Sequence, residues 1–419
     1  MISQVRMMKM DGKRACRRCG LPVMLMPGNR EALPLDEDGI CIYCRLYDDY
    51  DFLKDPCFDK RKACLDEAIE SLRGQNRYDA VVMFTGGKDS AYTACILKEQ
   101  YGLNVLALTW ENGFFGPDQR ANIDNMVKSL DLEHRFVSLD RDVLADFFRN
   151  RLRNYGRFCS CLLPALFFCS PLIDESEAPL IFISTSYGQV LGGYLNMVLR
   201  HADNPDAGDL VTKTWQGPDL ALVSLENDYF YYAMLRDILV GELAPTTVKV
   251  AADCLRAFNR LRARNARVAH LTMCMACLPD TMVETISAHG WVCPAGAAEA
   301  GHTSCVVEPL KGYLAYRQDM LNPDFLELAA ARRSGRCSEE QFSEDVQHLG
   351  YFMDEPRECV ARLLDVLQIS REEFDEIVKA RRYANKTAPA INEELFRRLP
   401  VHMPFEELKR HLNRAYSFG

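Results

Sequence analysis

The sequence predicts an α/β protein with an open parallel sheet and helices on both of its faces. Residues 80–84 (AVVMF) form a short apolar run rich in β-branched and aromatic residues, which is typical of a strand buried on both faces. Similar runs follow at residues 105–110, 134–139 and 179–184, and a helical pattern at 117–132 separates two of them. Strands that alternate with helices make a parallel sheet, and its ligands bind at the carboxyl ends of the strands.

Length and composition suit a cytosolic protein of two or three domains. The chain has 419 residues, of which 48% are hydrophobic and 26% are charged, so it can bury a large core. Its formal charge of −9 argues against a nucleic-acid partner, and the basic stretch at 256–267 is interpreted as a solvated helix face. The first fifteen residues lack the apolar core of a signal peptide, and the apolar stretch at 162–173 is too short to span a bilayer. Its 17 cysteines are therefore better interpreted as metal ligands or thiols than as disulfides.

The first motif along the chain is a pair of CxxC knuckles, and each knuckle has a glycine beside it. Four thiolates in this arrangement suit tetrahedral Zn²⁺ and leave no open position for catalysis. We therefore expect a structural zinc ribbon, whose metal supplies folding energy that so short a module cannot obtain from its own core. The predicted ligands are Cys16, Cys19, Cys41 and Cys44.

A helical stripe at residues 59–75 leads into the first strand, and a glycine loop follows that strand directly. The loop reads Thr85-Gly86-Gly87-Lys88-Asp89-Ser90, and a helical pattern begins at Ala91. Glycines let the backbone approach a ligand closely, and the free N–H groups and dipole of a helix N-terminus favour an anion. The four-residue spacer of the common phosphate-binding lysine loop is missing. The alternative is an ordinary glycine turn between a core strand and a helix.

The carboxyl ends of the other strands indicate where the rest of the site lies. Residues 110–113 close the second strand, and residues 184–189 close the fourth. From residue 322 onward the pattern is helical, with capping boxes at 338–341 and 370–373 and a last helix at 392–399. No catalytic constellation appears in this last region, so we expect it to serve packing, substrate closure or partner docking.

The loop at 85–90 resembles the S/T-G-G-x-D-S motif of the PP-loop ATP pyrophosphatases. That resemblance implies cleavage of ATP between its α and β phosphates and adenylation of a carbonyl or carboxylate oxygen, which nitrogen or sulfur then replaces. It also implies that the segment after the second strand holds adenine and ribose, which indicates Leu108, Trp110 and Asn112. For Trp110, a place in the core is the alternative.

Several further blocks resemble the N-acetyl sugar amidotransferases of surface-polysaccharide biosynthesis. They include the GICxxC segment at 39–44, TGGKDSAY at 85–92, and the segments at 108–134, 179–194 and 302–316. The resemblance implies conversion of an acetamido to an acetamidino group with ATP and ammonia, on a small sugar-like substrate, with ammonia supplied by a partner glutamine amidotransferase. Family members usually carry a CxxC after the third strand, whereas this chain has Cys159 and Cys161 in a CxC pair.

The surplus cysteines raise a sulfur-inserting alternative. Some PP-loop enzymes hold an iron–sulfur cluster or a persulfide on a CxxC pair plus a third cysteine. Here Cys274 and Cys277 with Cys161 would make such a set, or with Cys159 a second zinc site. Inert buried cysteines, which pack like small apolar residues, are the other interpretation.

The expected organisation has four parts, and the second carries the chemistry. They are a zinc-binding four-cysteine module (1–58), a PP-loop ATP-binding domain (59–200), a diverged substrate region with a CxxC pair (201–320) and a helical region (321–419). We expect Lys88 to neutralise developing charge, Asp89 to orient Mg²⁺ or the loop, and Ser90 to cap the helix and contact a phosphate. A non-catalytic, zinc-containing nucleotide-binding module is a third hypothesis, and the intact Lys88, Asp89 and Ser90 count against it.

Overall fold

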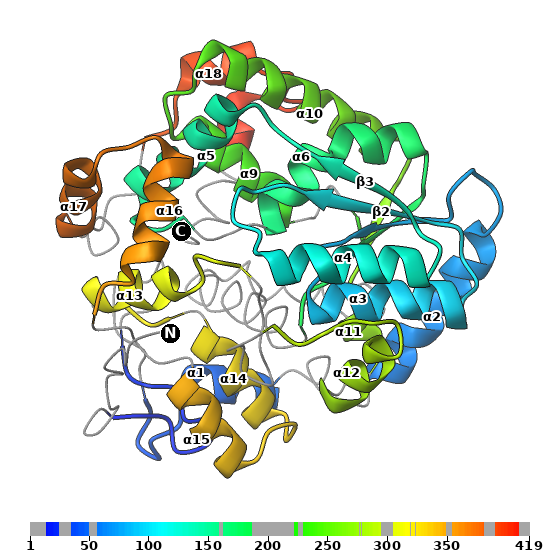
Figure 1. The fold of residues 1–419 in the computed structure, drawn as a ribbon, viewed down its shortest axis with the longest axis horizontal. Helices are drawn as coiled ribbons and strands as arrows, with labels where there is room; N and C mark the ends of the chain where they lie inside the picture. The colour runs from blue at the N-terminus through cyan, green and yellow to red at the C-terminus, as the bar shows by residue number, and fades with distance from the viewer. Residues whose placement is uncertain are drawn as a thin grey trace.

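The computed structural model contains a six-stranded sheet with helices around it (Figure 1). The described residues are 14–24, 35–49, 57–158, 162–186, 222–224, 229–275, 277, 279–294, 305–318, 320–322, 324–348, 354–380 and 390–409. Within them no helix is long and apolar enough to cross a membrane.

The sheet has the strand order β3-β2-β1-β4-β6-β5. The strands are β1 (Ala80–Met83), β2 (Val105–Trp110), β3 (Glu133–Val137), β4 (Leu180–Ile183), β5 (Leu222–Ser224) and β6 (Arg267–Ala269). The first four and β6 are parallel, and β5 runs antiparallel to β6 at one edge. From β1 the chain adds β2 and then β3 on one side. It then returns to place β4 on the other side of β1, and β6 lies beyond β4. Such a reversal of strand order is where open α/β sheets place their ligands.

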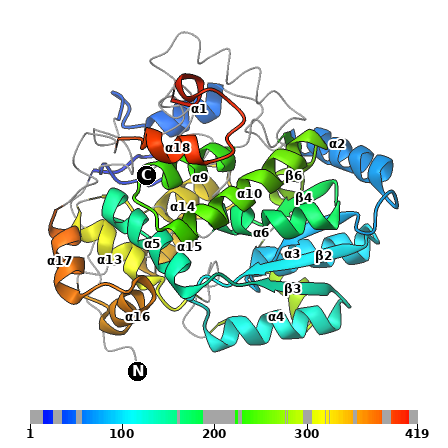
Figure 2. The same ribbon diagram turned by 90° about the horizontal axis from the view of Figure 1, so that it is seen from above.

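Side chains alternate along the central strands, so each face of the sheet has its own core. Val81 and Met83 of β1 face one core, which α5 (Arg141–Tyr155), α6 (Leu162–Ser176) and α10 (Pro245–Ala263) complete. Ala80 and Val82 face the other core, which is completed by α2 (Cys57–Leu72), α3 (Lys88–Cys95), α4 (Pro117–Ser129) and α12 (Pro279–Ser287). Figure 2 shows α4 on the opposite side of β2 and β3 from α6 and α10. The predicted fold class is confirmed.

The N-terminal cysteine module packs against helices from late in the chain. The module contains α1 (Ile42–Asp49), and it shares one apolar core with residues of α13 (Pro309–Arg317), α14 (Asp324–Arg333) and α15 (Glu339–His348). Figure 1 shows α1, α14 and α15 side by side. This shared core provides the apolar contacts that the module lacks by itself.

Most of the remaining helices cover the first core, whereas α11 (Leu271–Cys274) packs into the second core beside α2. The others are α9 (Tyr229–Leu239), α16 (Arg357–Leu367), α17 (Arg371–Lys379) and α18 (Glu393–Arg398), and a π-helical turn, η2 (Ile96–Gln100), extends α3. The serine half of each predicted capping box is present, because Ser338 Oγ accepts from Gln341 N and Ser370 Oγ accepts from Glu373 N, each at 3.1 Å. The three-residue strands β5 and β6 were not predicted.

Candidate active site

The loop between β1 and α3 lies at the carboxyl end of the central part of the sheet, beside the reversal of strand order. Gly86 has a φ of +72°, and a Cβ built on it would lie 2.6 Å from Ile123 Cγ1 and 2.9 Å from the carbonyl oxygen of Gln119. Glycine is therefore required at this position. The turn brings the chain to Gly87, the N-cap of α3, where the free N–H groups of the first helical turn begin.

Ser90 braces the loop from inside. Its hydroxyl accepts from Thr85 N at 3.1 Å and donates to Gly87 O at 3.0 Å. The prediction that Ser90 caps the helix is wrong, because the N-cap is Gly87 and Ser90 stands at the third helical position. From there the hydroxyl reaches back across the turn and fixes its shape.

Lys88 and Asp89 form an ion pair at the start of α3. Lys88 Nζ lies 2.9 Å from Asp89 Oδ1, and the two side chains are only 6% and 14% exposed. Lys88 Nζ also lies 3.8 Å from Met282 Sδ on α12. The ammonium is therefore held under α12 as part of a shielded ion pair.

Two side chains that the sequence did not indicate hold the loop from neighbouring segments. Gln119 in the first turn of α4 donates from Nε2 to Thr85 O at 2.7 Å. Trp291, after α12, donates from Nε1 to Gly86 O at 3.0 Å. Because both carbonyls are satisfied from outside, the backbone of the loop is positioned before any ligand arrives.

The residues predicted to hold adenine lie at the end of β2, but their side chains point into the interior. Trp110 is 4% exposed and stacks on Phe148, with ring centroids 5.8 Å apart. Leu108 is fully buried in the same core, and Asn112 Oδ1 accepts from Phe114 N at 2.8 Å. Trp110 therefore lies in the core, as its alternative interpretation predicted. The role of these three residues in binding a base stays a prediction.

Beyond β4 and β6, a buried histidine completes the same edge of the sheet. His270 follows β6, and its Nδ1 lies 3.1 Å from Thr185 Oγ1 after β4. Burial lowers the pKa of His270 to about 4, so the ring is neutral near pH 7. Thr272 Oγ1 donates to Thr185 O at 2.8 Å, which ties the ends of these two strands together.

Cys277 lies within electrostatic range of Lys88 and Asp89, and Cys274 is buried in the neighbouring core, where its Sγ lies 3.5 Å from His270 O. The pKa of Cys277 is raised to about 12, first by burial and then by the Asp89 carboxylate, while Lys88 acts in the opposite direction. Burial likewise raises the pKa of Cys274 to about 12. As free groups both are protonated thiols near pH 7, which are poor nucleophiles. Their predicted partners, Cys159 and Cys161, lie outside the described residues.

The four predicted ligands of the N-terminal module form a compact group. The Sγ atoms of Cys16, Cys19, Cys41 and Cys44 all lie within 4.8 Å of one another, and all four residues are buried. The Cys16–Cys44 and Cys19–Cys41 sulfur separations are 3.8 and 3.6 Å. A zinc tetrahedron with bonds of about 2.3 Å has sulfur–sulfur edges of about 3.8 Å. The donor set therefore fits a tetrahedral metal ion.

The charge of this group is balanced by an arginine from α14. Arg333 Nε donates to Cys44 Sγ at 3.4 Å, and Arg333 is 6% exposed. Burial works against its charged form, but the Cys19 and Cys44 sulfurs raise the pKa of Arg333 above its usual range. Neighbouring sulfurs hold the pKa of Cys16 far below that of a free thiol and raise that of Cys41. Four such thiols ionise together only when a cation joins them.

Comparisons with known proteins give limited similarity. No family model matches the sequence. An uncharacterized protein from Methanocaldococcus jannaschii is 27% identical over 125 residues, which cover 30% of this chain and 44% of the relative. The match thus spans less than half the length of that relative. A U34-tRNA thiolase from Methanococcus maripaludis, solved with its [4Fe-4S] cluster, superposes with a TM-score of 0.32 at 10% identity, over 93% of this chain and 98% of the other. A TM-score this low does not establish a common fold.

Proposed function

We propose that this chain is an AMP-forming enzyme of the PP-loop type, which adenylates an oxygen of its substrate. The observation that carries the proposal is the loop at 85–90. Six residues of the motif occupy the turn from the central strand into α3, at the reversal of strand order. The loop is fixed from inside by Ser90 and from outside by Gln119 and Trp291. A preorganised backbone of this kind stabilises charge on a leaving group without reorganising.

The roles of the loop residues follow from their places. The N–H groups at the start of α3 bind the β and γ phosphates of ATP, and Lys88 stabilises the negative charge that grows on pyrophosphate. Asp89 orients Lys88 through their ion pair and offers a carboxylate oxygen to Mg²⁺. Bound Mg²⁺ would supply neutralisation of the phosphate charge. Ser90 keeps the turn in shape.

The proposed reaction has two steps. A substrate carbonyl oxygen attacks the α-phosphorus, the bond from that phosphorus to the β-phosphate oxygen breaks, and pyrophosphate leaves. A nitrogen or sulfur nucleophile then attacks the activated carbon, and AMP departs with the original oxygen. The chain positions the reactants and stabilises charge in both steps. The buried four-cysteine group fills a tetrahedral coordination shell with protein donors, so we assign its Zn²⁺ a structural role.

Nitrogen and sulfur remain two candidates for the incoming atom. The resemblance of the sequence blocks to N-acetyl sugar amidotransferases favours nitrogen, with ammonia from a partner subunit. The position of Cys277 beside Lys88 and Asp89 favours sulfur, because a sulfur carrier must lie where the adenylated substrate is held. The pKa of about 12 for Cys277 means that sulfur chemistry would need a metal or cluster to ionise the thiol.

The proposal is tested by the products of ATP. We expect AMP and pyrophosphate when the protein is incubated with ATP, Mg²⁺, ammonium or sulfide, and a panel of acetamido sugars, with mass spectrometry to show which atom replaces oxygen. Asp89→Asn and Ser90→Ala should each lower AMP formation about 100-fold or more. Asp253→Asn changes a half-exposed carboxylate on α10, and this control variant should form AMP at the rate of the parent protein. Formation of ADP in place of AMP would refute the proposal.

A further inference from the structure

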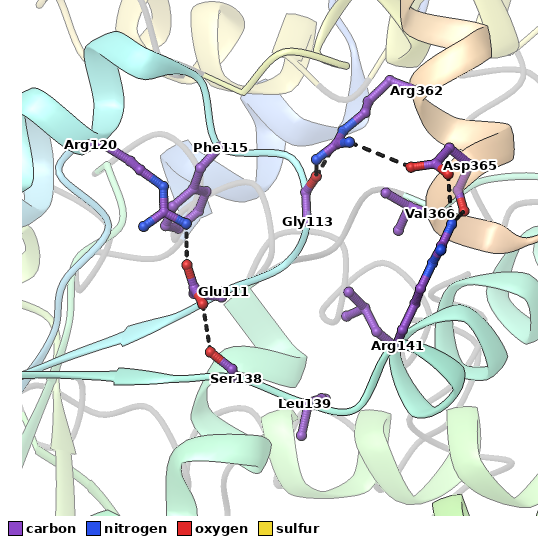
Figure 3. Close-up of a pocket in the computed structure, with 11 residues that line it drawn as sticks. Glu111, Gly113, Phe115, Arg120, Ser138, Leu139, Arg141, Arg362, Asp365 and Val366 are labelled. Atoms are coloured by element: carbon purple, nitrogen blue, oxygen red, sulfur yellow. Dashed lines mark hydrogen bonds and ion pairs between the residues drawn. The ribbon is translucent and has the colours of Figure 1, made fainter.

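A cavity of about 300 Å³ lies at the carboxyl ends of β2 and β3, one strand away from the loop. Glu111 and Gly113 follow β2, Ser138 follows β3, and Arg362 and Val366 come from α16 (Figure 3). Arg362 donates from Nη2 to Gly113 O at 2.6 Å, which joins α16 to the segment after β2. The cavity is therefore assembled from parts of the chain that are far apart in sequence.

The lining carries more positive than negative charge. Three guanidinium groups, those of Arg120, Arg141 and Arg362, face two carboxylates, those of Glu111 and Asp365. Arg120 pairs with Glu111, and Arg141 Nη2 lies 2.6 Å from Asp365 Oδ1. Figure 3 shows Arg120 on one side of the cavity and Arg141 with Arg362 on the other. Arg362 Nη1 also lies 3.5 Å from Asp365 Oδ2, so two arginines share Asp365 and the lining carries a net charge of +1.

Two of these arginines keep donors for a ligand. Within the described part of the chain, Arg120 and Arg141 make hydrogen bonds and ion pairs through Nη2 alone. Their Nε and Nη1 groups remain, and the planar fork of a guanidinium suits phosphate and carboxylate oxygens. The Arg120 guanidinium lies over the ring of Phe136, 5.3 Å from its centroid, so its orientation is already restricted.

The same cavity offers acceptors for hydroxyl groups. Glu111 Oε2 accepts from Ser138 Oγ at 2.5 Å, and Glu111 and Asp365 retain further oxygen lone pairs. Ligand pockets in proteins begin at about 300 Å³, so the volume suits one small molecule. Carboxylates beside arginines match a compact ligand that bears both hydroxyls and an anionic group.

The first turn of α4 contacts both the cavity and the loop at 85–90. Gln119 donates to Thr85 O of the loop, and the next residue, Arg120, lines the cavity. Both belong to the first turn of α4. A ligand anchored in the cavity is thus held by the same helical turn that positions the loop.

We propose that this cavity binds the anionic group of the acceptor substrate, a small hydroxylated molecule that carries a phosphate or a carboxylate. This inference rests on the proposed function, because only that function makes the ligand of the cavity the acceptor substrate. Anchoring at the arginines leaves the uncharged end of the acceptor, with its carbonyl, to extend toward the loop.

The test measures binding to the full chain by calorimetry, with α,β-methylene-ATP present so that no adenylation occurs. N-Acetylglucosamine 1-phosphate tests the phosphate, N-acetylneuraminate tests the carboxylate, and N-acetylglucosamine is the neutral control. We expect at least one anionic sugar to bind and the neutral sugar to bind at least tenfold more weakly. Arg120→Gln and Arg141→Gln should each raise the Kd of the anion about tenfold, since each removes a charge-assisted donor.

Arg256→Gln is the matched control. Its side chain is 51% exposed on α10, against 50% for Arg120, and it lies outside the cavity lining. This variant should bind the sugars as the parent does, and all three variants should bind α,β-methylene-ATP with unchanged affinity.

The outcomes separate the two proposals. If the protein binds α,β-methylene-ATP but neither anionic sugar, or if Arg120→Gln and Arg141→Gln leave anion binding unchanged, the cavity proposal is wrong and the proposed function stands. The cavity proposal would also be overturned if the anionic sugar competed with the nucleotide. It would be overturned as well if the protein bound tRNA instead of the sugars and Arg120→Gln and Arg141→Gln abolished that binding. Failure to bind the nucleotide at all would refute the proposed function instead.

Discussion

Gly86→Ala is the substitution whose cost the structure defines most closely. The φ of +72° at Gly86 lies in the left-handed region, which costs an alanine about 1–2 kcal/mol. The added Cβ would also lie 2.6 Å from Ile123 Cγ1 and 2.9 Å from Gln119 O. The second contact is with backbone, which cannot rotate away, and overpacking of this kind costs about 1–3 kcal/mol. We therefore expect the free energy of unfolding to fall by roughly 2–5 kcal/mol.

Gly102→Ala separates the two contributions. Gly102 also has a positive φ, +62°, but no heavy atom lies within 4 Å of the position of an added Cβ. This variant should lose about 1–2 kcal/mol, the backbone contribution alone. Urea unfolding monitored by tryptophan fluorescence gives the free energy of unfolding of both variants. Trp291 is a suitable probe for the first variant, because it donates to Gly86 O.

The functional readout distinguishes a displaced loop from a merely weakened protein. Gly86→Ala should abolish AMP formation under conditions where the variant is still folded, because the loop has to move away from α4. Gly102→Ala should retain activity. If Gly86→Ala is no less stable than Gly102→Ala, the close contact between the loop and α4 described above does not exist.

Two further predictions concern the metal group and the buried histidine. Arg333→Met removes the donor to Cys44 Sγ and should speed zinc loss to a colorimetric chelator about 10- to 100-fold, while Arg357→Met, an exposed arginine on α16, should not. Neutral His270, with a pKa of about 4 when folded and about 6.5 when unfolded, contributes stability that is complete above about pH 6.5 and is lost as the pH falls toward 4. That loss is roughly 3 kcal/mol. His270→Gln should remove this part of the pH dependence of the free energy of unfolding. If the variant keeps the parent's slope of unfolding free energy against pH between about pH 6.5 and 4, the assignment to His270 is wrong.

The loop and the first four strands could be predicted because their signals are local. Six consecutive residues define the turn at 85–90, and the apolar run at 105–110 coincides with β2. The predicted strand at 134–139 overlaps β3, which begins one residue earlier and ends two residues sooner. Strand β6 was missed because three residues, Arg267–Ala269, are too few to show a period. The basic stretch at 256–267, expected to form one helix face, ends inside β6 after α10 has stopped at Ala263.

The contacts that hold the site could not be predicted, because they join distant parts of the chain. Trp291 reaches Gly86 across 205 residues, and nothing in the residues around Trp291 indicates that partner. Arg362 likewise reaches Gly113 across 249 residues, and nothing in the sequence of the region expected to serve packing, substrate closure or partner docking indicated that its helix α16 lines a cavity. Spacing within CxxC pairs predicted the cysteine group, whereas its arginine comes from a helix with no metal-ligand pattern.

The core shared by the cysteine module and α14 has a consequence for the order of events on the ribosome. Cys44 and Arg333 are separated by 289 residues, which take roughly 15–60 s to synthesise. During that interval the nascent module exists without the helices that cover it, and its four thiols are open to any soft cation or oxidant in the surroundings. An ion bound in that interval would be covered later, when α14 and α15 pack on the module.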